Sequence, residues 1–123
     1  MKSYLIVILF FVSNSLFSQY IEGLSATQNG TNQIKVNLKT YLPSEGHYIT
    51  YTKNIEQSYI TLKVCYYMGS FGGPAVVTHL SNDFYIDIPD NGNFTLNVNL
   101  YTSGFESTCD YSNLEDTAVL NFT

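Results

Sequence analysis

Apolar and polar residues alternate along most of the chain after residue 20, and this alternation limits the possible folds more than any other feature. In residues 33–41, for example, one parity carries Ile34, Val36, Leu38 and Thr40, and the other carries Lys35, Asn37, Lys39 and Tyr41. Successive side chains of a β-strand point to opposite faces of the sheet. No stretch after residue 20 has the 3.6-residue period of an amphipathic helix. The sequence therefore predicts an all-β fold.

The alternating stretches are short and are separated by residues that favour turns. Asn29-Gly30 and Asn91-Gly92 tolerate positive φ, residues 43–46 (PSEG) suit a chain reversal, and residues 69–74 (GSFGGP) form the loosest linker. The expected strands are 21–27, 33–41, 47–52, 58–67, 75–80, 84–88, 94–101 and 117–122. Roughly seven to eight short strands, with a turn about every 8–12 residues, predict one antiparallel β-sandwich or barrel domain.

Residues 1–18 have the features of a secretory signal peptide. Lys2 is the only charged residue before Glu22, and residues 4–12 (YLIVILFFV) are all apolar or aromatic. This apolar run is shorter than the about 20 residues that cross a bilayer. A buried N-terminal strand would need turn signals that are missing here. We expect cleavage before Gln19, with an earlier site near Ser15 as the alternative. The domain would then span residues 19–123, be secreted or periplasmic, and have no membrane span.

Cys65 and Cys109 are the only two cysteines, and we expect them to form one disulfide bond. Disulfides persist in the compartments that exported proteins reach. A zinc site is disfavoured because the two cysteines lack paired ligand spacing, and a catalytic thiol is disfavoured because neither His47 nor His79 lies in a recognisable nucleophile context. Closing a loop of about 45 residues would stabilise the fold by about 4 kcal/mol in the chain-entropy model.

The composition excludes several classes of function. Only 12% of the residues are charged, and five Lys without any Arg face ten acidic residues, for a formal net charge of -5. Nucleic-acid binding needs clusters of Lys or Arg, which are missing. Aromatic residues make up 15% of the chain, unlike a disordered chain.

No catalytic, cofactor-binding or metal-binding motif is present in the sequence. The expectation is therefore a protein that is not an enzyme and that binds no cofactor and no metal ion. Asp83, Asp87 and Asp90 are the closest acidic set, but a calcium ion needs six to eight oxygen ligands. We interpret these three acids as solvated residues beside a strand.

Residues 90–96 (DNGNFTL) resemble the Asp-x-Gly-x-Tyr-x-Cys corner that opens strand F of immunoglobulin domains. Phe94 and Leu96 replace the Tyr and Cys of that motif. The chain also resembles small secreted immunoglobulin-like sandwich proteins of Bacteroidetes-type bacteria, whose signal peptides often end in the same Ser-Gln step as Ser18-Gln19. The resemblance implies an immunoglobulin-like antiparallel β-sandwich.

The immunoglobulin-like arrangement also implies where the disulfide lies. With 94–101 as strand F and 117–122 as strand G, Cys109 falls in the F–G loop. With 47–52 as strand C and 58–67 as strand C′, Cys65 lies at the same end of the sandwich. Cys65 has the opposite parity to Ile60, Leu62 and Val64, so the bond would hold a loop outside the core.

Aromatic residues gather near that end and suggest a contact surface. Tyr is enriched at binding surfaces, although β-sheets also favour Tyr for packing alone. Residues 68–74 and 103–114 form the expected contact regions. The candidate binding residues are Tyr66, Tyr67, Phe71, Phe105 and Tyr111.

The sequence thus suggests a non-enzymatic binding or structural module with a protein or glycan partner. The alternative is a secreted inhibitor of an extracellular hydrolase. The oligomeric state is left open.

Overall fold

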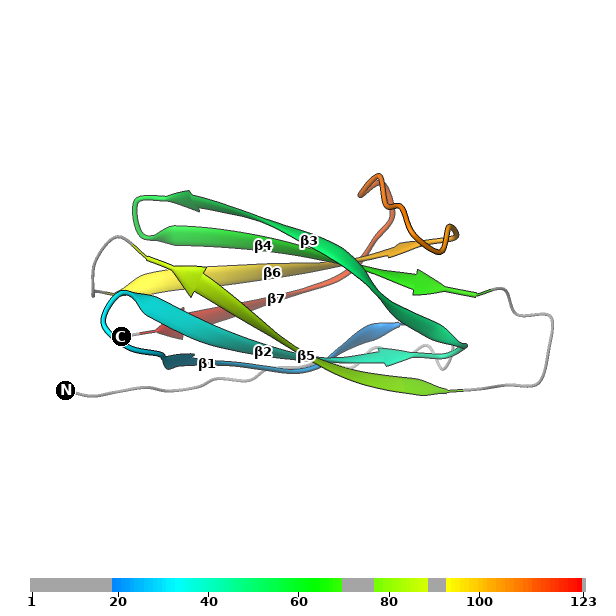
Figure 1. Cartoon of the computed structure of the whole chain (residues 1–123), viewed down its shortest axis with the longest axis horizontal. Coiled ribbons are helices and arrows are strands. Elements are labelled where there is room, and N and C mark those ends of the chain that lie inside the picture. Colours follow the sequence, from blue (N-terminus) through cyan, green and yellow to red (C-terminus); the bar gives the residue numbers. More distant parts are fainter. Residues whose placement is uncertain (1–18, 70–76, 89–92, 123) are drawn as a thin grey trace.

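A computed structural model describes residues 19–69, 77–88 and 93–122, and all regular secondary structure in these ranges is β-strand (Figure 1). The prediction of an all-β fold is confirmed. None of the described residues forms a helix of the length and apolarity needed to cross a membrane. The described strands are β1 (Tyr20–Gln28), β2 (Gln33–Leu42), β3 (Gly46–Glu56), β4 (Tyr59–Met68), β5 (Thr78–Asp87), β6 (Phe94–Ser103) and β7 (Leu114–Phe122).

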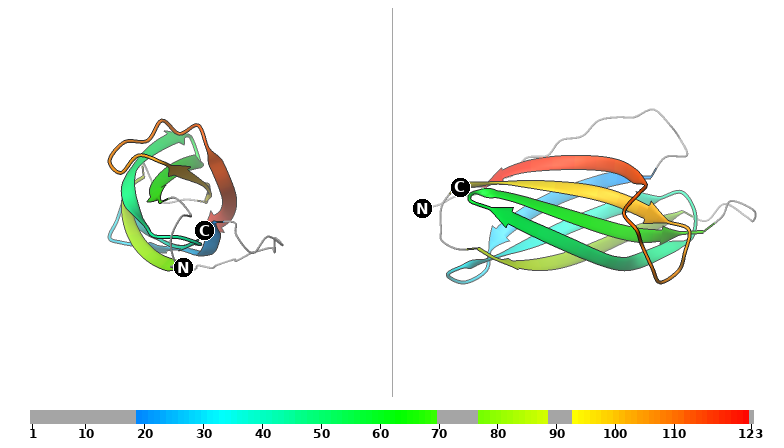
Figure 2. Two further views of the ribbon diagram at one scale, coloured as in Figure 1. Left: turned by 90° about the vertical axis from the view of Figure 1, so that its right-hand side faces the viewer. Right: turned by 90° about the horizontal axis from the view of Figure 1, so that it is seen from above.

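The strands form two sheets that pack face to face, as the end-on and top views in Figure 2 show. One sheet has the order β1-β2-β5, and the other has the order β3-β4-β6-β7. The expected signal peptide (1–18), Phe71 and the Asp90-Asn91-Gly92 part of the corner motif lie outside the described residues. The part of that motif that is described begins β6, where Phe94 stacks on Phe122 with ring centroids 4.9 Å apart.

The core lies between the sheets and is built from the alternating apolar residues. On β2 and β6 every second side chain points inward and is almost completely buried. The side chains of opposite parity on these strands are mostly polar and only partly buried. The inner residues are Leu24 and Ala26 of β1, Ile34, Val36, Leu38 and Leu42 of β2, Ile60, Leu62, Val64 and Tyr66 of β4, Phe84 and Ile86 of β5, Phe94, Leu96, Val98 and Leu100 of β6, and Leu120 and Phe122 of β7, with Ile88 just after β5.

The four-stranded sheet is mixed, because β4 and β6 run parallel to each other. The prediction of a purely antiparallel sandwich is therefore wrong at this pair. In an immunoglobulin variable-type sheet, strand C lies next to strand F. Here β4, the strand expected to be C′, takes the position beside β6, and β3 lies at the edge of the sheet. A strand that crosses through the other sheet, β5, connects the parallel pair.

One long strand, β5, replaces the two strands expected at 75–80 and 84–88. The sequence Ser81-Asn82-Asp83 suggested a break between them. In the structure, Ser81 and Asp83 point to solvent, and the Asn82 amide oxygen accepts a hydrogen bond of 2.8 Å from the hydroxyl of Tyr66. Asn82 is therefore tolerated within the strand, because the buried Tyr66 side chain from the facing sheet provides its hydrogen-bond partner.

A β-bulge between Tyr48 and Thr50 changes the parity of the edge strand β3. Tyr48 and Tyr51 are three residues apart and would lie on opposite faces of a regular strand. The extra residue lets both rings approach Phe84 of β5, at centroid distances of 5.9 and 4.9 Å. Within the described residues no backbone ladder joins β3 to β5, and these rings cover the core at that side of the sandwich.

Candidate functional site

The structure contains the predicted disulfide bond between Cys65 and Cys109, whose Cα atoms lie 6.5 Å apart. The sequence-based prediction of this pairing is confirmed. Cys65 is completely buried, yet it does not belong to the core between the sheets. It lies on the outer face of β4, as its parity predicted, and the segment that carries Cys109 covers it.

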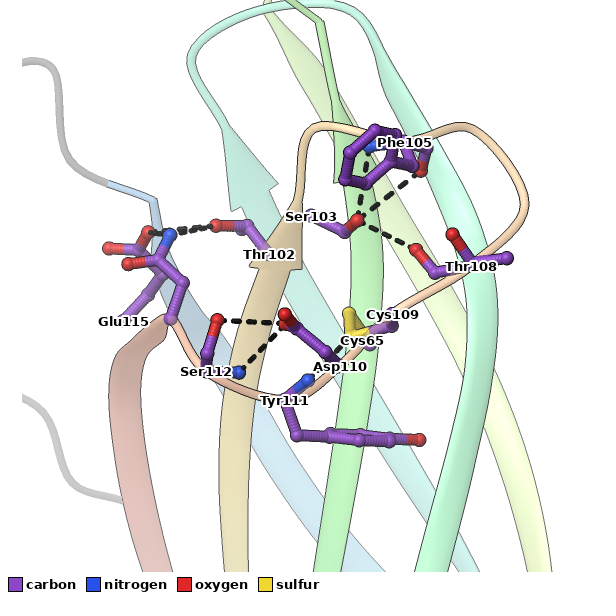
Figure 3. The surroundings of a disulfide bond; sticks show 11 residues. Cys65, Thr102, Ser103, Phe105, Thr108, Cys109, Asp110, Tyr111, Ser112 and Glu115 are labelled. Carbon is purple, nitrogen blue, oxygen red and sulfur yellow. Dashed lines mark hydrogen bonds between the residues drawn. A yellow bond between two sulfur atoms is a disulfide. The ribbon is translucent and has the colours of Figure 1, made fainter.

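Residues 104–113 connect β6 to β7, and we call them the cystine loop. Figure 2 shows this loop crossing one end of the four-stranded sheet, and Figure 3 shows the disulfide beneath it. At its base the Thr102 hydroxyl donates to Glu115 at 2.8 Å, and the Asn113 amide donates to both Thr102 and Glu115 at 2.7 Å. These bonds fix the distance between the two strands from which the loop departs.

Ser103 organises the first half of the cystine loop (Figure 3). Its hydroxyl donates a hydrogen bond of 2.7 Å to the carbonyl oxygen of Thr108 and accepts one of 3.1 Å from the backbone amide of Phe105. The ring of His47, on β3, bonds the carbonyl oxygen of Glu106 at 3.0 Å. The loop is thereby attached to the far edge of the sheet as well as to its own strands.

Asp110, Tyr111 and Ser112 form a tight turn in the second half of the cystine loop. The Ser112 hydroxyl and backbone amide both donate to the Asp110 carboxylate, at 2.7 and 3.2 Å, and they hold its pKa below the usual range. Tyr111 adopts a φ of 56° and lays its ring edge-on against Tyr101 at 5.4 Å. The turn thus directs the Tyr111 ring onto the sheet rather than into solvent.

Phe105 is the residue of the predicted binding set that the structure leaves open to solvent. Its side chain is 72% exposed, the highest value among the large hydrophobic residues of the described ranges. The cystine loop presents it above the sheet, next to the Ser103 hydrogen bonds that hold its backbone (Figure 3). The backbone that carries this exposed apolar ring is thus held by a side chain of β6.

The prediction that Tyr66 belongs to a binding surface is wrong. Tyr66 is completely buried, and its ring spans the two sheets to reach Asn82. Its parity within 58–67 is that of Ile60, Leu62 and Val64, so the alternation itself places it in the core.

The other three candidate binding residues lie in three different parts of the chain. Tyr111 is half-buried and its hydroxyl is shielded from solvent, so it forms the base of the cystine loop. Tyr67 is half-buried on the outer face and lies 5.0 Å from the ring of His47. Phe71 lies outside the described residues.

No protein-family model, curated protein or solved structure matches this chain. The geometry of the described residues is therefore what defines the candidate site. Sequence reasoning missed the roles of His47 and Ser103, which hold the loop through its backbone. A serine two residues before the exposed Phe105 was the available signal, since Ser hydroxyls often bond nearby backbone groups.

The two histidines occupy different sheets and have different partners. His47 bonds a backbone carbonyl of the cystine loop, whereas His79 lies 3.1 Å from the carboxylate of Glu22 on the outer face of the three-stranded sheet. Among the residues with described positions, no group of three or more His, Cys, Asp or Glu side chains could hold a metal ion.

The burial of Tyr66 predicts how stability responds to alkaline pH. Loss of hydration in the core raises its pKa from 10.0 to about 12. The pKa of Tyr66 is higher in the folded than in the unfolded protein. The neutral, buried Tyr66 side chain therefore makes its full contribution to stability below about pH 10, and this contribution is lost as the pH rises towards about 12. Between these pH values the free energy of unfolding, measured in urea, should fall by about 1.4 kcal/mol more per pH unit for the wild type than for Tyr66→Phe. Equal pH slopes for the two proteins would contradict the prediction.

Proposed function

We propose that this protein is an exported, non-enzymatic binding module that contacts its partner through the cystine loop. The observation that carries the proposal is the exposed Phe105 ring on a loop that the disulfide and at least three side chains hold in place. A partner pays less conformational entropy to bind a loop that is already ordered. Large aromatic side chains at the centre of an interface also contribute a large share of binding energy.

Export of the chain is supported by the signal-like features of residues 1–18 and by the disulfide bond. A buried disulfide that holds a loop is compatible with a periplasmic or extracellular location, where such bonds persist. An immunoglobulin-like relationship is supported by the division of the strands between the two sheets and by the corner motif at 90–96. If the domain is related to immunoglobulin domains, β3 and β4 have exchanged their positions in the sheet, so that β4 and not β3 lies beside β6.

The proposal is tested by photo-crosslinking from the exposed ring. A benzophenone amino acid at position 105 should link the protein to its partner in the material secreted by the source cells. The same amino acid at Tyr59, which is 46% exposed on β4 away from the loop, should not. Phe105→Ala should then weaken binding of the captured partner about 30-fold, consistent with a hot spot of about 2 kcal/mol.

Tyr59→Ala is the matched control because it removes an exposed aromatic ring elsewhere on the same domain. Equal affinity of the wild type and Phe105→Ala for a partner bound through this module would remove the cystine loop from the interface. The fold of both variants is checked by circular dichroism.

A second candidate function is the inhibition of an extracellular hydrolase. The attachment of the cystine loop at both ends and at Glu106 favours it, because a loop that resists rearrangement can occupy an enzyme cleft without being processed. Assays against secreted proteases and glycosidases should then show inhibition by the wild type and at least tenfold weaker inhibition by Phe105→Ala. Binding of a partner without any inhibition would favour the module over the inhibitor.

A further inference from the structure

The four edge strands of the described sandwich differ in how regular they are. β1 has an irregular register between Ile21 and Gly23, β3 between Tyr48 and Thr50, and β7 opposite Leu100 and Tyr101. Such bulges interrupt the ladder of backbone groups that another strand would need. β5 pairs with β2 without a register shift over ten residues. It is the one described edge strand whose ladder is continuous.

The neighbours of β1 and β7 restrict these edges further. The backbone amide of Ile21 donates to the Asp116 carboxylate at 2.9 Å, so these two edges approach one another across the sheets. β5 has no strand partner on its second side within the described residues, and the rings of Tyr48 and Tyr51 reach it only through Phe84. Within the described residues, the backbone of Thr78–Asp87 therefore pairs with no strand on that side, and the Thr78 hydroxyl donates to the Ser44 carbonyl oxygen at 3.0 Å.

We propose that the free edge of β5 binds an extended segment of a partner protein by adding it as a fourth strand to the β1-β2-β5 sheet. Strand addition of this kind takes its affinity from the main chain and its specificity from alternate side chains. This surface lies in the sheet opposite the cystine loop, so the inference is independent of the proposed function.

The side chains of β5 define the chemistry of the added strand. The outward parity presents Asp83, Tyr85 and Asp87, all exposed. Each carboxylate already accepts one hydrogen bond from a β2 side chain, Asp83 from Asn37 at 2.8 Å and Asp87 from Gln33 at 2.9 Å. The ammonium of Lys35 lies 3.8 Å from Asp83. A carboxylate has about four acceptor positions, so both groups can still bond a cationic side chain. Opposite charges directly across a strand pair stabilise it and like charges destabilise it. The added strand therefore carries Lys or Arg at two positions four residues apart, opposite Asp83 and Asp87.

The inward parity requires apolar residues in the same segment. Phe84 and Ile86 are buried on the inner face of β5, and the rings of Tyr48 and Tyr51 lie alongside Phe84. Apolar side chains at the intervening positions of the added strand would pack against these rings. The resulting pattern is basic, apolar, small polar, apolar, basic. A second copy of β5 does not fit this pattern, since it would bring additional acidic residues to the edge.

The probe is a capped peptide that contains Lys-Val-Thr-Val-Lys at its centre, a pattern that is the same in both strand directions. Titration into the full domain should shift the amide resonances of Thr78–Asp87 and slow their hydrogen exchange. A peptide with Glu in place of both Lys should bind at least tenfold more weakly. A third peptide carries N-methyl groups on all five central residues. It keeps the side-chain pattern but offers no backbone donor to β5 in either strand direction, so it should lose binding.

The charge-reversed protein provides the matched test. Asp83→Lys combined with Asp87→Lys should bind the Glu peptide in preference to the Lys peptide. Glu56→Lys combined with Glu106→Lys makes the same change in net charge at exposed positions on β3 and the cystine loop and should keep the wild-type preference. Phe105→Ala should also bind like the wild type, which separates this inference from the cystine loop.

Three results would overturn the inference. One is unchanged affinity of the fully N-methylated peptide, which would show an interaction with side chains alone. The second is resonance shifts that centre on β3 or the cystine loop. The third is concentration-dependent dimerisation through β5, which would make a second copy of the chain the occupant of the edge.

Discussion

Replacing both Cys65 and Cys109 with alanine is expected to lower the free energy of unfolding by about 4 kcal/mol. The bond closes a loop with a sequence separation of 44, and its removal gives the unfolded chain more conformations. The loss is a large part of the stability of a domain of this size. Guanidinium unfolding in the absence of reductant measures the change, and the thermal midpoint should fall by about 15 °C or more.

Ser107→Ala, in the exposed part of the cystine loop, is the control for the disulfide variant, since Ser107 is solvent-exposed and is expected to leave stability unchanged. Reduced wild-type protein should unfold like the double alanine variant. A loss below about 1 kcal/mol in the double variant would show that the hydrogen bonds of Thr102, Ser103 and His47 hold the loop without the crosslink.

Truncation of Tyr66 to alanine is expected to destabilise the protein by about 3–5 kcal/mol. Its ring is completely buried between the sheets, and its hydroxyl bonds Asn82 across them. The variant therefore leaves both a cavity and an amide oxygen without its buried donor. Chemical denaturation measures the effect, and a variant that does not fold would exceed the expected loss in the same direction.

Phe105→Ala provides the contrast, because the ring is 72% exposed and touches little of the domain. Its free energy of unfolding should stay within about 0.5 kcal/mol of the wild type. Tyr66→Phe keeps the ring volume and removes only the hydroxyl, so it should lose about 1–3 kcal/mol. Similar losses for Tyr66→Ala and Phe105→Ala would contradict the burial of Tyr66.

The alternation of side chains was sufficient to predict most of the strands and most of the core, although β5 is one strand where two were expected. On β2, β4 and β6 the residues of the core between the sheets fall on the predicted parity, because successive side chains of a regular strand point to opposite faces. The alternation fails at β3, where the bulge at Tyr48–Thr50 brings two tyrosines to the same face. A bulge depends on the strand opposite, and that strand is not known from the local sequence.

The order of the strands could not be predicted by the same reasoning. Either β3 or β4 could lie beside β6, since both present one apolar face to the same core. The structure places β4 beside β6, whereas the resemblance to immunoglobulin domains suggested the other arrangement.

The disulfide was predictable because only one pairing was possible and the chain has export-like features. The binding set was partly predictable for a different reason. Phe105 and the loop that carries it follow from the position of Cys109 between two strands. The parity that Tyr66 shares with Ile60, Leu62 and Val64 was enough to assign it to the core. Tyr111 lies in a loop without such a pattern, so its burial depends on the Tyr101 ring that the fold brings beside it. The supporting roles of His47 and Ser103 depend on backbone carbonyls that only the folded loop brings close.

The parallel pairing of β4 with β6 has a consequence for how the chain folds. The hairpins β3–β4 and β6–β7 each form from strands that are neighbours in sequence, whereas β4 meets β6 only after the chain has passed through the opposite sheet. Non-local contacts of this kind form slowly. Cys65 belongs to the first hairpin and Cys109 to the connection of the second, so the sulfur atoms meet when the two hairpins dock. The disulfide therefore ties together the two hairpins whose docking forms the four-stranded sheet.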